Sequence, residues 1–470
     1  MQGKSYRPGL ETSLHRVSIR EISGCFFCLD HRIVNKTKPA GNLALVLYYH
    51  WLNRFSFNAL AGAIDSHPDL AALPVTLATT ADRLHQAAAA LLRHYDQVAV
   101  GLSMLTSQIR TMRHVVRQLR SDFGSRVTIL AGGAHPTACA DEVLRDGADI
   151  VFRGEAEASF PAVLKRIADN ANFLDIAGVS WFSDGSTISM PHRQPVDLDR
   201  FFSFSPKRGM FGPIEITRGC PFACGYCQTS HIFGTRPRHR GIDNIVRQAE
   251  ALRSGHRKVV RLLSPNAFSY GSPDGRQINL PAMRKLLAAL RETVSAEGKI
   301  IFAHFPSEAR PEHVTPDTLE LLKEFADNDE IVIGAQSGSQ RVLDACRRSH
   351  TVEDVLNAVF LARKHGVKVI VDFIFGLPGE SPSDERESLS VIRKLASIGA
   401  RVHPHAFTPL PQTGFSAETP ARISAAVLQA IRELEAQRGI YVNRREILRG
   451  FESQGQTSIS VRTGLQTRPK

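Results

Sequence analysis

Three of the seven cysteines lie close together, at Cys220, Cys224 and Cys227, in a C-x3-C-x2-C spacing. Glycines at positions 219 and 225 disfavour a helix or a strand there, so the three thiols are expected on a tight loop. Clustered thiolates suit a soft metal, and iron–sulfur clusters are held by cysteine thiolates. Because cubane clusters usually take four cysteines, three ligands would leave one iron with an open position, as in a catalytic metal site.

Zinc bound by the same thiols is the alternative, and it needs a fourth ligand, for which His231 is the nearest candidate. A further cysteine pair, Cys25 and Cys28, stands near the N-terminus with His31 three residues on. No second pair follows it, and the two phenylalanines between these thiols also fit a small hydrophobic cluster. The pair therefore stays open between a metal or redox role and a packing role.

The composition is that of an ordinary globular protein, with 470 residues of which 43% are hydrophobic and 22% are charged. This length allows two or three domains with full-sized cores. No apolar run reaches the roughly 20 residues that span a bilayer, and the N-terminus shows no apolar signal core. An odd number of cysteines, three of them in one motif, favours a reducing cytoplasm over a disulfide framework.

The net charge of +12 is concentrated at the two ends of the chain. Residues 1–39 carry seven basic and three acidic groups, and residues 437–470 carry seven and two, so the tails supply nine of the twelve charges. Basic tails can bind polyanions, but a solvated tail is the commoner case. Because the body between the tails is close to neutral, nucleic acid is disfavoured as a partner.

From residue 41 to about residue 170 the chain alternates strand and helix patterns. Apolar runs typical of buried parallel strands lie at 43–48, 74–77, 97–102, 127–131 and 149–152. Helical patterns lie at 55–64, 80–93, 108–123, 137–146 and up to about 169. The alternation predicts an α/β fold with a doubly wound, Rossmann-like parallel sheet, whose ligands bind outside the carboxyl ends of the strands.

Glycines mark two of those strand ends. The stretch Gly-Gly-Ala-His-Pro-Thr at 132–137 lets the backbone approach a ligand and opens a helix, and Gly154-Glu155 does the same one strand later. Residues 171–206 are expected to connect two domains, through a hairpin at 178–188 with an Asp-Gly turn.

A second series of strand and helix patterns begins at Pro213, directly before the cysteine loop. Its strands are predicted at 213–217, 258–263, 299–304, 330–335, 367–374 and 400–407. Its helices are predicted at 243–253, 281–295, 317–326, 352–365, 383–397 and from about 420. Six such units predict a partial (βα)6 barrel, in which functional residues lie at the C-terminal ends of the strands.

The cysteine motif resembles that of the radical S-adenosylmethionine (radical SAM) enzymes, including the preceding Thr-Arg-Gly at 217–219 and an aromatic residue, Tyr226, before the third cysteine. The resemblance implies that Cys220, Cys224 and Cys227 hold a [4Fe–4S] cluster. It also implies that the open iron binds the amino and carboxylate groups of S-adenosylmethionine, with Tyr226 against the adenine. In that family the cluster cleaves the sulfonium to give a 5′-deoxyadenosyl radical, and the protein orients this chemistry and excludes water.

Four further strand ends, at 264–266, 306–311, 336–339 and 375–380, match the same family. The third carries Gln336 where many relatives have a glutamate, so the amide keeps an acceptor and loses a charge. The resemblance implies that Glu308 and Arg310 meet the polar groups of S-adenosylmethionine and that the last stretch passes beside the adenine. The implied contacts are Ser264, Glu308, Arg310, Gln336, Ser337 and Gly376. No catalytic acid or base is assigned.

Residues 98–168 resemble the cobalamin-binding domain that precedes many radical SAM domains, most specifically at 132–137 and 153–157. The cobalt-ligating Asp-x-His-x-x-Gly motif of mutases has its nearest counterpart at 48–53, which lacks the aspartate and the glycine, so His50 is not expected to bind cobalt. His135 fits a loop hydrogen bond better than a cobalt ligand. The implied cobalamin contacts are Ser103, Met104, Thr106, Gly132, Gly133, His135, Thr137, Gly154 and Glu155.

Five segments are expected: a basic extension (1–40), a cobalamin-binding domain (41–170), a hairpin and linker (171–206), a radical SAM barrel (207–410) and a helical extension (411–470). The resemblance implies a cytoplasmic enzyme that uses a [4Fe–4S] cluster, S-adenosylmethionine and cobalamin. Its implied partners are a small-molecule substrate and an electron donor such as flavodoxin or ferredoxin, without nucleic acid or membrane. Its leading reaction is methyl transfer to an unactivated carbon, with one S-adenosylmethionine methylating cobalamin and another generating the radical.

Two other enzymatic functions stay open. Relatives with the same two domains also carry out ring rearrangements and cyclisations. Methylthiotransferases acting on tRNA or ribosomal protein share the layout, but they carry three additional cysteines in the N-terminal domain, where residues 41–170 offer only Cys139, and a small C-terminal β-barrel, where this sequence is helical. A regulator that only senses cobalamin or iron is disfavoured, because no DNA-binding helix pair is visible.

Overall fold

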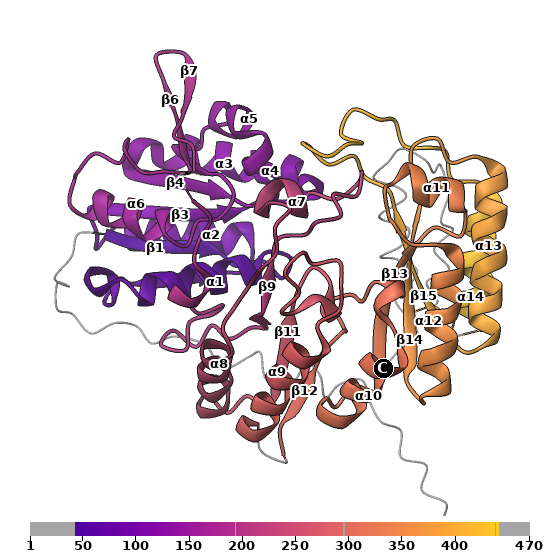
Figure 1. Cartoon of the computed structure of the whole chain (residues 1–470). Helices are drawn as coiled ribbons and strands as arrows, with labels where there is room; N and C mark the ends of the chain where they lie inside the picture. The colour runs from indigo at the N-terminus through magenta and orange to yellow at the C-terminus, as the bar shows by residue number, and fades with distance from the viewer. Residues whose placement is uncertain (1–42, 193, 295–296, 438, 441–470) are drawn as a thin grey trace, which may run out of the picture. The chain divides into compact units, whose positions relative to one another are not determined.

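The computed structural model describes residues 43–192, 194–294, 297–437 and 439–440 (Figure 1). The basic N-terminal extension with Cys25 and Cys28, and the basic tail from residue 441, lie outside the described residues. None of the described helices combines the length and the apolar character that a membrane span requires.

Seven strands form the first sheet, in the order β2-β1-β3-β4-β5-β6-β7. They are β1 (Leu43–Tyr48), β2 (Val75–Ala78), β3 (Gln97–Ser103), β4 (Val127–Gly132), β5 (Ile150–Phe152), β6 (Val179–Ser183) and β7 (Ser186–Ser189). Strands β1 to β5 pair in parallel, and β6 and β7 are antiparallel to their neighbours. The parallel part confirms the predicted doubly wound sheet.

Helices cover both faces of this sheet because side chains alternate along its strands. Leu43, Leu45 and Leu47 of β1 pack in one core cluster with residues of α1 (Arg54–Asp65) and α6 (Ser159–Ala168). The residues between them, such as Val46, pack in a second cluster with α2 (Ala81–Leu91), α3 (Ile109–Phe123) and α5 (Ala140–Arg145). The Thr80 side chain caps α2 as predicted, accepting a hydrogen bond from the Arg83 amide at 3.2 Å.

Two segments differ from the sequence prediction. The hairpin β6–β7, expected in a linker, extends the first sheet because β6 pairs with β5, and its Asp184-Gly185 turn has positive φ at both positions, 49° and 78°. The helix expected from Thr137 begins earlier, at α4 (Ala134–Ala138), directly after Gly133 with its φ of 99°. Thr137 therefore lies within α4 rather than at the start of a helix.

Six parallel strands follow one another in chain order in the second core. Strands β8 (Ile214–Glu215), β11 (Val259–Leu263) and β12 (Lys299–Ile301) form one sheet, and β13 (Glu330–Gln336), β14 (Lys368–Phe375) and β15 (Arg401–Ala406) form another. The segment after β12 joins them, since the Val332 amide donates to Ala303 O at 2.9 Å and the Ala309 amide donates to Val332 O at 2.8 Å. This arrangement confirms the predicted partial barrel.

Helices on the outside of the barrel pack over a shared apolar core. They are α8 (Ile242–Ser254), α9 (Leu280–Thr293), α10 (Pro316–Phe325), α12 (Val352–Lys364), α13 (Pro382–Ser397) and α14 (Ala425–Ala436). In Figure 1 the orange helices α12 and α13 lie along the strands β14 and β15, and the yellow helix α14 lies beside α13. On β14, Val371 and Phe373 belong to this core, so Asp372, which stands between them, faces the inside of the barrel.

Candidate functional site

The cysteine loop connects the short strand β9 (Thr217–Arg218), which pairs with β10 (Arg238–His239), to helix α7 (Thr229–Phe233). Backbone hydrogen bonds fix it at both ends: the Cys220 amide donates to Gly234 O at 3.1 Å, and the Cys227 amide donates to Cys224 O at 3.0 Å. Cys224 is buried and the other two thiols are half-buried. The structure thus brings the three predicted ligands together on one ordered turn.

The spacing of the thiols disfavours zinc. Two sulfurs bound to one zinc ion at about 2.3 Å lie at most about 4.6 Å apart. Among the described side chains, two groups of three have ligand atoms that all lie within 4.8 Å of one another, and the three thiols are not one of these groups. The separation of the three thiols suits a cubane cluster better than a single metal ion.

Two buried arginines face the cysteine loop. Arg348 Nη1 lies 3.8 Å from Cys224 Sγ, and its Nε is buried without a partner in the described structure. Arg310 Cζ lies 3.5 Å from the centroid of the Phe222 ring, inside the same loop. Burial raises the pKa of the thiols of Cys220 and Cys227, and iron ligation deprotonates such thiols outright. The donor set and the adjacent positive charge therefore fit an anionic cluster and a carboxylate-bearing ligand.

Tyr226 packs in an apolar cluster that sequence reasoning did not find. Its partners are Val342, Cys346, Ile374, Leu377, Phe407 and Phe415. The Phe415 amide donates to Gly225 O at 2.8 Å, and a Cβ on Gly225 would lie 2.9 Å from the Phe415 ring. Gln228 Nε2 donates to Pro411 O at 2.9 Å. The segment after β15 therefore covers the cysteine loop, although no motif in the sequence marks it.

The predicted S-adenosylmethionine contacts do not all face the inside of the barrel. Gln336 and Glu308 come together inside the barrel, because a Cβ on Gly334 would lie 2.7 Å from Gln336 Nε2 and 2.9 Å from Glu308 Oε2. Ser337 is turned the other way, since its Oγ lies 3.3 Å from the Oγ of Ser388 in α13.

Arg310 lies over Phe222 of the cysteine loop, as described above, and the other two predicted contacts lie at strand ends. Gly376 follows β14 with a φ of 78°, and its amide donates to Glu380 Oε2 at 2.6 Å. Ser264 follows β11, and its Oγ donates to Asn266 O at 2.7 Å.

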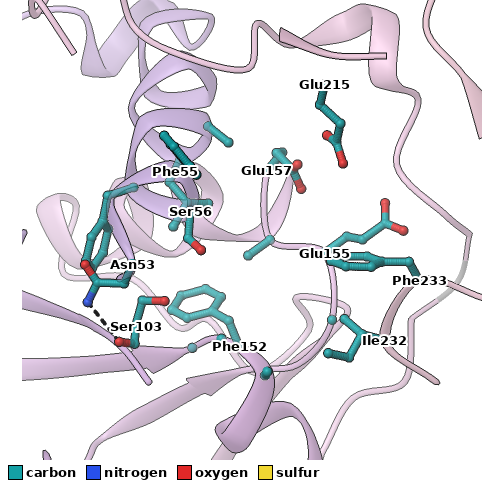
Figure 2. Close-up of a pocket in the computed structure, with 18 of the residues that line it drawn as sticks. Asn53, Phe55, Ser56, Ser103, Phe152, Glu155, Glu157, Glu215, Ile232 and Phe233 are labelled. Carbon is teal, nitrogen blue, oxygen red and sulfur yellow. Dashed lines mark hydrogen bonds between the residues drawn. The ribbon is translucent and has the colours of Figure 1, made fainter. Parts of the chain in front are cut away.

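A cavity of about 470 Å³ lies between the carboxyl end of the first sheet and the strands β8, β9 and β11 (Figure 2). Of the nine predicted cobalamin contacts, five line it: Ser103, Gly132, Gly133, Gly154 and Glu155. Thr217, Arg218 and Ser264 line it from the barrel. A Cβ on Gly133 would lie 2.8 Å from Met104 O and 2.9 Å from Met104 N, so this loop requires glycine.

The other four predicted contacts do not line this cavity. Met104 is buried in the apolar core beneath the sheet. Thr137 joins the two glycine loops, since its Oγ1 donates to Gly133 O at 2.7 Å and accepts from the Gly154 amide at 2.9 Å. His135 Nδ1 lies 3.2 Å from Thr106 Oγ1, and the opposite side of its ring faces Glu142 at 3.5 Å. His50 is also absent from the lining, and its Nδ1 accepts from the Leu52 amide at 3.3 Å.

One side of the cavity carries a buried ion network. Arg218, whose side chain is 7% exposed, lies 3.1 Å from Glu155, 2.5 Å from Glu157 and 2.6 Å from Glu215. In Figure 2 these three glutamates lie on the side opposite Asn53 and Phe55. Burial alone would raise the pKa of Glu157, but the Arg218 guanidinium outweighs it and holds the pKa below its ordinary value.

The same network engages both carboxylate oxygens of Glu155. Its Oε1 pairs with Arg238, and its Oε2 accepts from Arg218, Arg238 and the Val196 amide. Arg218 stands two residues before Cys220. The loop after β5 of the first sheet is therefore tied to the residue that leads into the cysteine loop.

The two cores match two protein-family models. Residues 214–392 match the radical SAM superfamily, and residues 60–164 match the B12 binding domain. Together the two segments cover more than half of the chain. The chain belongs to the radical SAM enzymes that carry a B12-binding domain, whose cofactors are a [4Fe–4S] cluster, S-adenosylmethionine and cobalamin.

Individual relatives are distant. An uncharacterized protein of Methanopyrus kandleri is 25% identical over 376 residues, which are 68% of this chain and 67% of the relative. A tRNA-2-methylthio-N(6)-dimethylallyladenosine synthase of Moorella thermoacetica is 30% identical over 255 residues, 52% of this chain and 54% of the relative. The chain thus matches between about half and two thirds of these relatives' lengths.

A solved structure shares the fold of both cores. The radical S-adenosylmethionine methyltransferase TsrM from Kitasatospora setae, with cobalamin and a [4Fe–4S] cluster bound, gives a TM-score of 0.61 at 13% identity. The match covers 80% of this chain and 74% of TsrM. At this identity the likeness concerns the fold alone.

Proposed function

We propose that this protein is a cobalamin-dependent radical SAM methyltransferase that methylates an unactivated carbon of a small molecule. The observation that carries the proposal is the cavity between the two cores. Glycine loops of the B12-binding domain line one side of it, and Arg218, two residues before the first cysteine, lines the other. A group held in this cavity would lie beside the loop that holds the cluster.

In this proposal Cys220, Cys224 and Cys227 are the cluster ligands. Arg348 stands beside Cys224 with an unpartnered Nε, and it would meet the carboxylate of S-adenosylmethionine. Tyr226 and the covering residue Phe415 would exclude water from the cluster. When bound, the cluster and S-adenosylmethionine supply the radical and cobalamin supplies the methyl group, while a flavodoxin or a ferredoxin would supply electrons.

Much of the lining of the cavity is apolar. Phe55, Phe152, Ile232 and Phe233 supply apolar surface (Figure 2), and Gly133 keeps the backbone open to close approach. We place cobalamin here, held by shape, with Ser103 and Gly154 at its edge. Both oxygens of Glu155 are engaged by arginines, so this residue would shape the cavity rather than bind the ligand.

The choice of methylation over methylthiolation rests on the cysteines. Between residues 41 and 206 the sequence contains only Cys139. Methylthiotransferases, which share this domain layout, carry three additional cysteines in their N-terminal domain. A second cluster in this region would lack ligands. The likeness to TsrM supports methylation only through the shared fold.

Metabolite analysis of a deletion strain tests the proposal. Wild-type and deletion strains would be grown with methyl-labelled methionine and compared by mass spectrometry. We expect at least one small molecule that carries the label on a carbon and is absent from the deletion strain, with its unmethylated form accumulating. A loss of methylthio-nucleosides from tRNA, or a missing product that carries no label, would overturn the proposal in favour of methylthiolation or rearrangement.

A further inference from the structure

A second cluster of possible metal ligands lies inside the barrel, on the neighbouring strands β14 and β15. Asp372 Oδ1 lies 2.9 Å from His403 Nδ1 and 3.8 Å from His405 Nε2. The three ligand atoms all lie within 4.8 Å of one another. None of these residues is part of the cysteine loop or of the cavity lining described above.

The two strands fix the positions of these side chains. Asp372 is the register partner of His403, and His405 stands two residues further along β15, on the same face. On the opposite face of β14, Val371 and Phe373 pack into the core beneath the helices. Ligands held by paired strands are positioned more firmly than ligands on loops, so the cluster is preorganised.

The cluster is closed on one side and open on the other. The side chain of Asp372 is 3% exposed, that of His403 is 15% exposed and that of His405 is 42% exposed. Three protein ligands with an accessible remaining position are the arrangement of a catalytic rather than a structural metal site. Two imidazoles and one carboxylate are a donor set that suits zinc and non-haem ferrous iron.

A second carboxyl group adjoins the cluster. The buried Glu308 carboxyl hydrogen-bonds that of Asp372. Two neighbouring buried carboxyl groups repel when both ionise, and a cation between them removes that cost.

We propose that Asp372, His403 and His405 bind one divalent transition metal ion, of the class of zinc or ferrous iron, inside the barrel and apart from the cluster cysteines. Its open positions would lie on the side of His405, where an oxygen or nitrogen atom of the substrate can reach the ion. Metal binding at these residues does not depend on the methyl transfer proposed above, because it requires neither S-adenosylmethionine nor cobalamin.

Zinc is the probe for this site, since a site of nitrogen and oxygen donors generally binds zinc more tightly than ferrous iron. The anaerobically reconstituted full-length protein would be equilibrated with Zn²⁺, and bound zinc and iron would be counted by mass spectrometry of the elements. Zinc K-edge absorption would then identify the ligand atoms. We expect about one zinc per chain, with nitrogen and oxygen at about 2.0–2.1 Å and no sulfur at about 2.3 Å.

Two variants and a control assign the zinc to these residues. His405→Ala removes the most exposed ligand, and Asp372→Asn removes the carboxylate charge with little change of shape. Each should weaken zinc binding by roughly 10-fold or more, the least that loss of a supporting partner usually costs a metal site. His304→Ala is the control, because His304 lies in the same barrel beside Glu330, at 3.4 Å, and outside the cluster.

Iron content and cobalamin binding, measured on every variant, show that the fold is intact. The proposal is overturned if wild-type protein binds no zinc, if the zinc has a sulfur shell, or if His405→Ala binds zinc as tightly as wild type. It is also overturned if His304→Ala loses zinc to the same extent as His405→Ala.

Discussion

The carboxyl ends of the two parallel sheets face their ligands in different ways. At the first sheet the loops present backbone and small residues, such as Gly133 and Gly154, and the polar side chains nearby bond to other parts of the chain. At the barrel, connecting segments present two charged side chains, Arg310 and Arg348, to the cysteine loop. In the proposed function the first region selects a ligand by shape and the second by charge and coordination, so substitutions should act differently in each.

Removal of the coordinating atoms should have the largest effect. Replacing Cys220, Cys224 and Cys227 together with alanine should reduce the iron of the reconstituted protein from about four atoms per chain to nearly none. Cys346→Ala is the matched control, because this fourth cysteine of the barrel packs among Val342, Leu377 and Phe407 and should leave the iron content unchanged. A cluster that persists in the triple variant would contradict the assignment.

Arg218 belongs to both regions, and its loss should destabilise the fold. Arg218→Ala removes the buried cation that three glutamates share, and only Glu155 keeps another, Arg238, so the free energy of unfolding should fall by about 3–5 kcal/mol. Arg284→Ala breaks an exposed pair with Glu324 and should cost about 0–1 kcal/mol. Urea denaturation followed by circular dichroism measures both, and equal losses would show that the network is not a structural link.

Shape should dominate at the first sheet. Gly133→Ala adds a Cβ within 3 Å of the Met104 backbone at a φ of 99°. The strain of about 1–3 kcal/mol should weaken cobalamin binding by roughly tenfold, with the iron content preserved. Gly124→Ala has a similar backbone strain, at a φ of 58°, but open space around it. Equilibrium dialysis of cobalamin should separate the two variants, and equal affinities would argue against a ligand at the Gly133 loop.

Substitution of the two histidines near the first sheet, His50 and His135, should not change the coordination of cobalt. If cobalamin is held by shape, its cobalt receives no nitrogen from the protein, because His50 and His135 both hydrogen-bond elsewhere. Electron paramagnetic resonance of bound cob(II)alamin should show no nitrogen superhyperfine splitting in wild type, His50→Ala or His135→Ala. A splitting in wild type that one of these variants abolishes would show that the first region also uses coordination.

The strand and helix patterns were sufficient to predict both cores, since buried parallel strands and amphipathic helices leave strong local signals. The strand ends were predicted less well, because neighbouring residues on a strand face opposite sides. Ser103 lines the cavity while Met104 enters the core, and Gln336 faces the barrel while Ser337 faces α13. The alternation of side chains along a strand is the signal that separates the members of each pair.

Other parts of the site could not be predicted from local sequence. Two of the three partners of Arg218, Glu155 and Glu157, lie some 60 residues earlier, and only tertiary packing brings them to it. The pairing of Asp372 with His403 depends on the register of two strands, which no motif specifies. The covering residue Phe415 lies in a segment without a recognisable pattern.

The Arg218 network has a consequence for engineering and for the exchange of domains between relatives. A chimera that joins this barrel to a B12-binding domain without glutamates at these two positions would deprive Arg218 and Arg238 of Glu155 and Glu157. Arg238 would then lose Glu155, and Arg218 would keep only Glu215 of its three carboxylate partners. Successful chimeras should therefore carry residues 153–157 together with the barrel. The boundary for exchange then follows the ion network and not the edge of the first sheet.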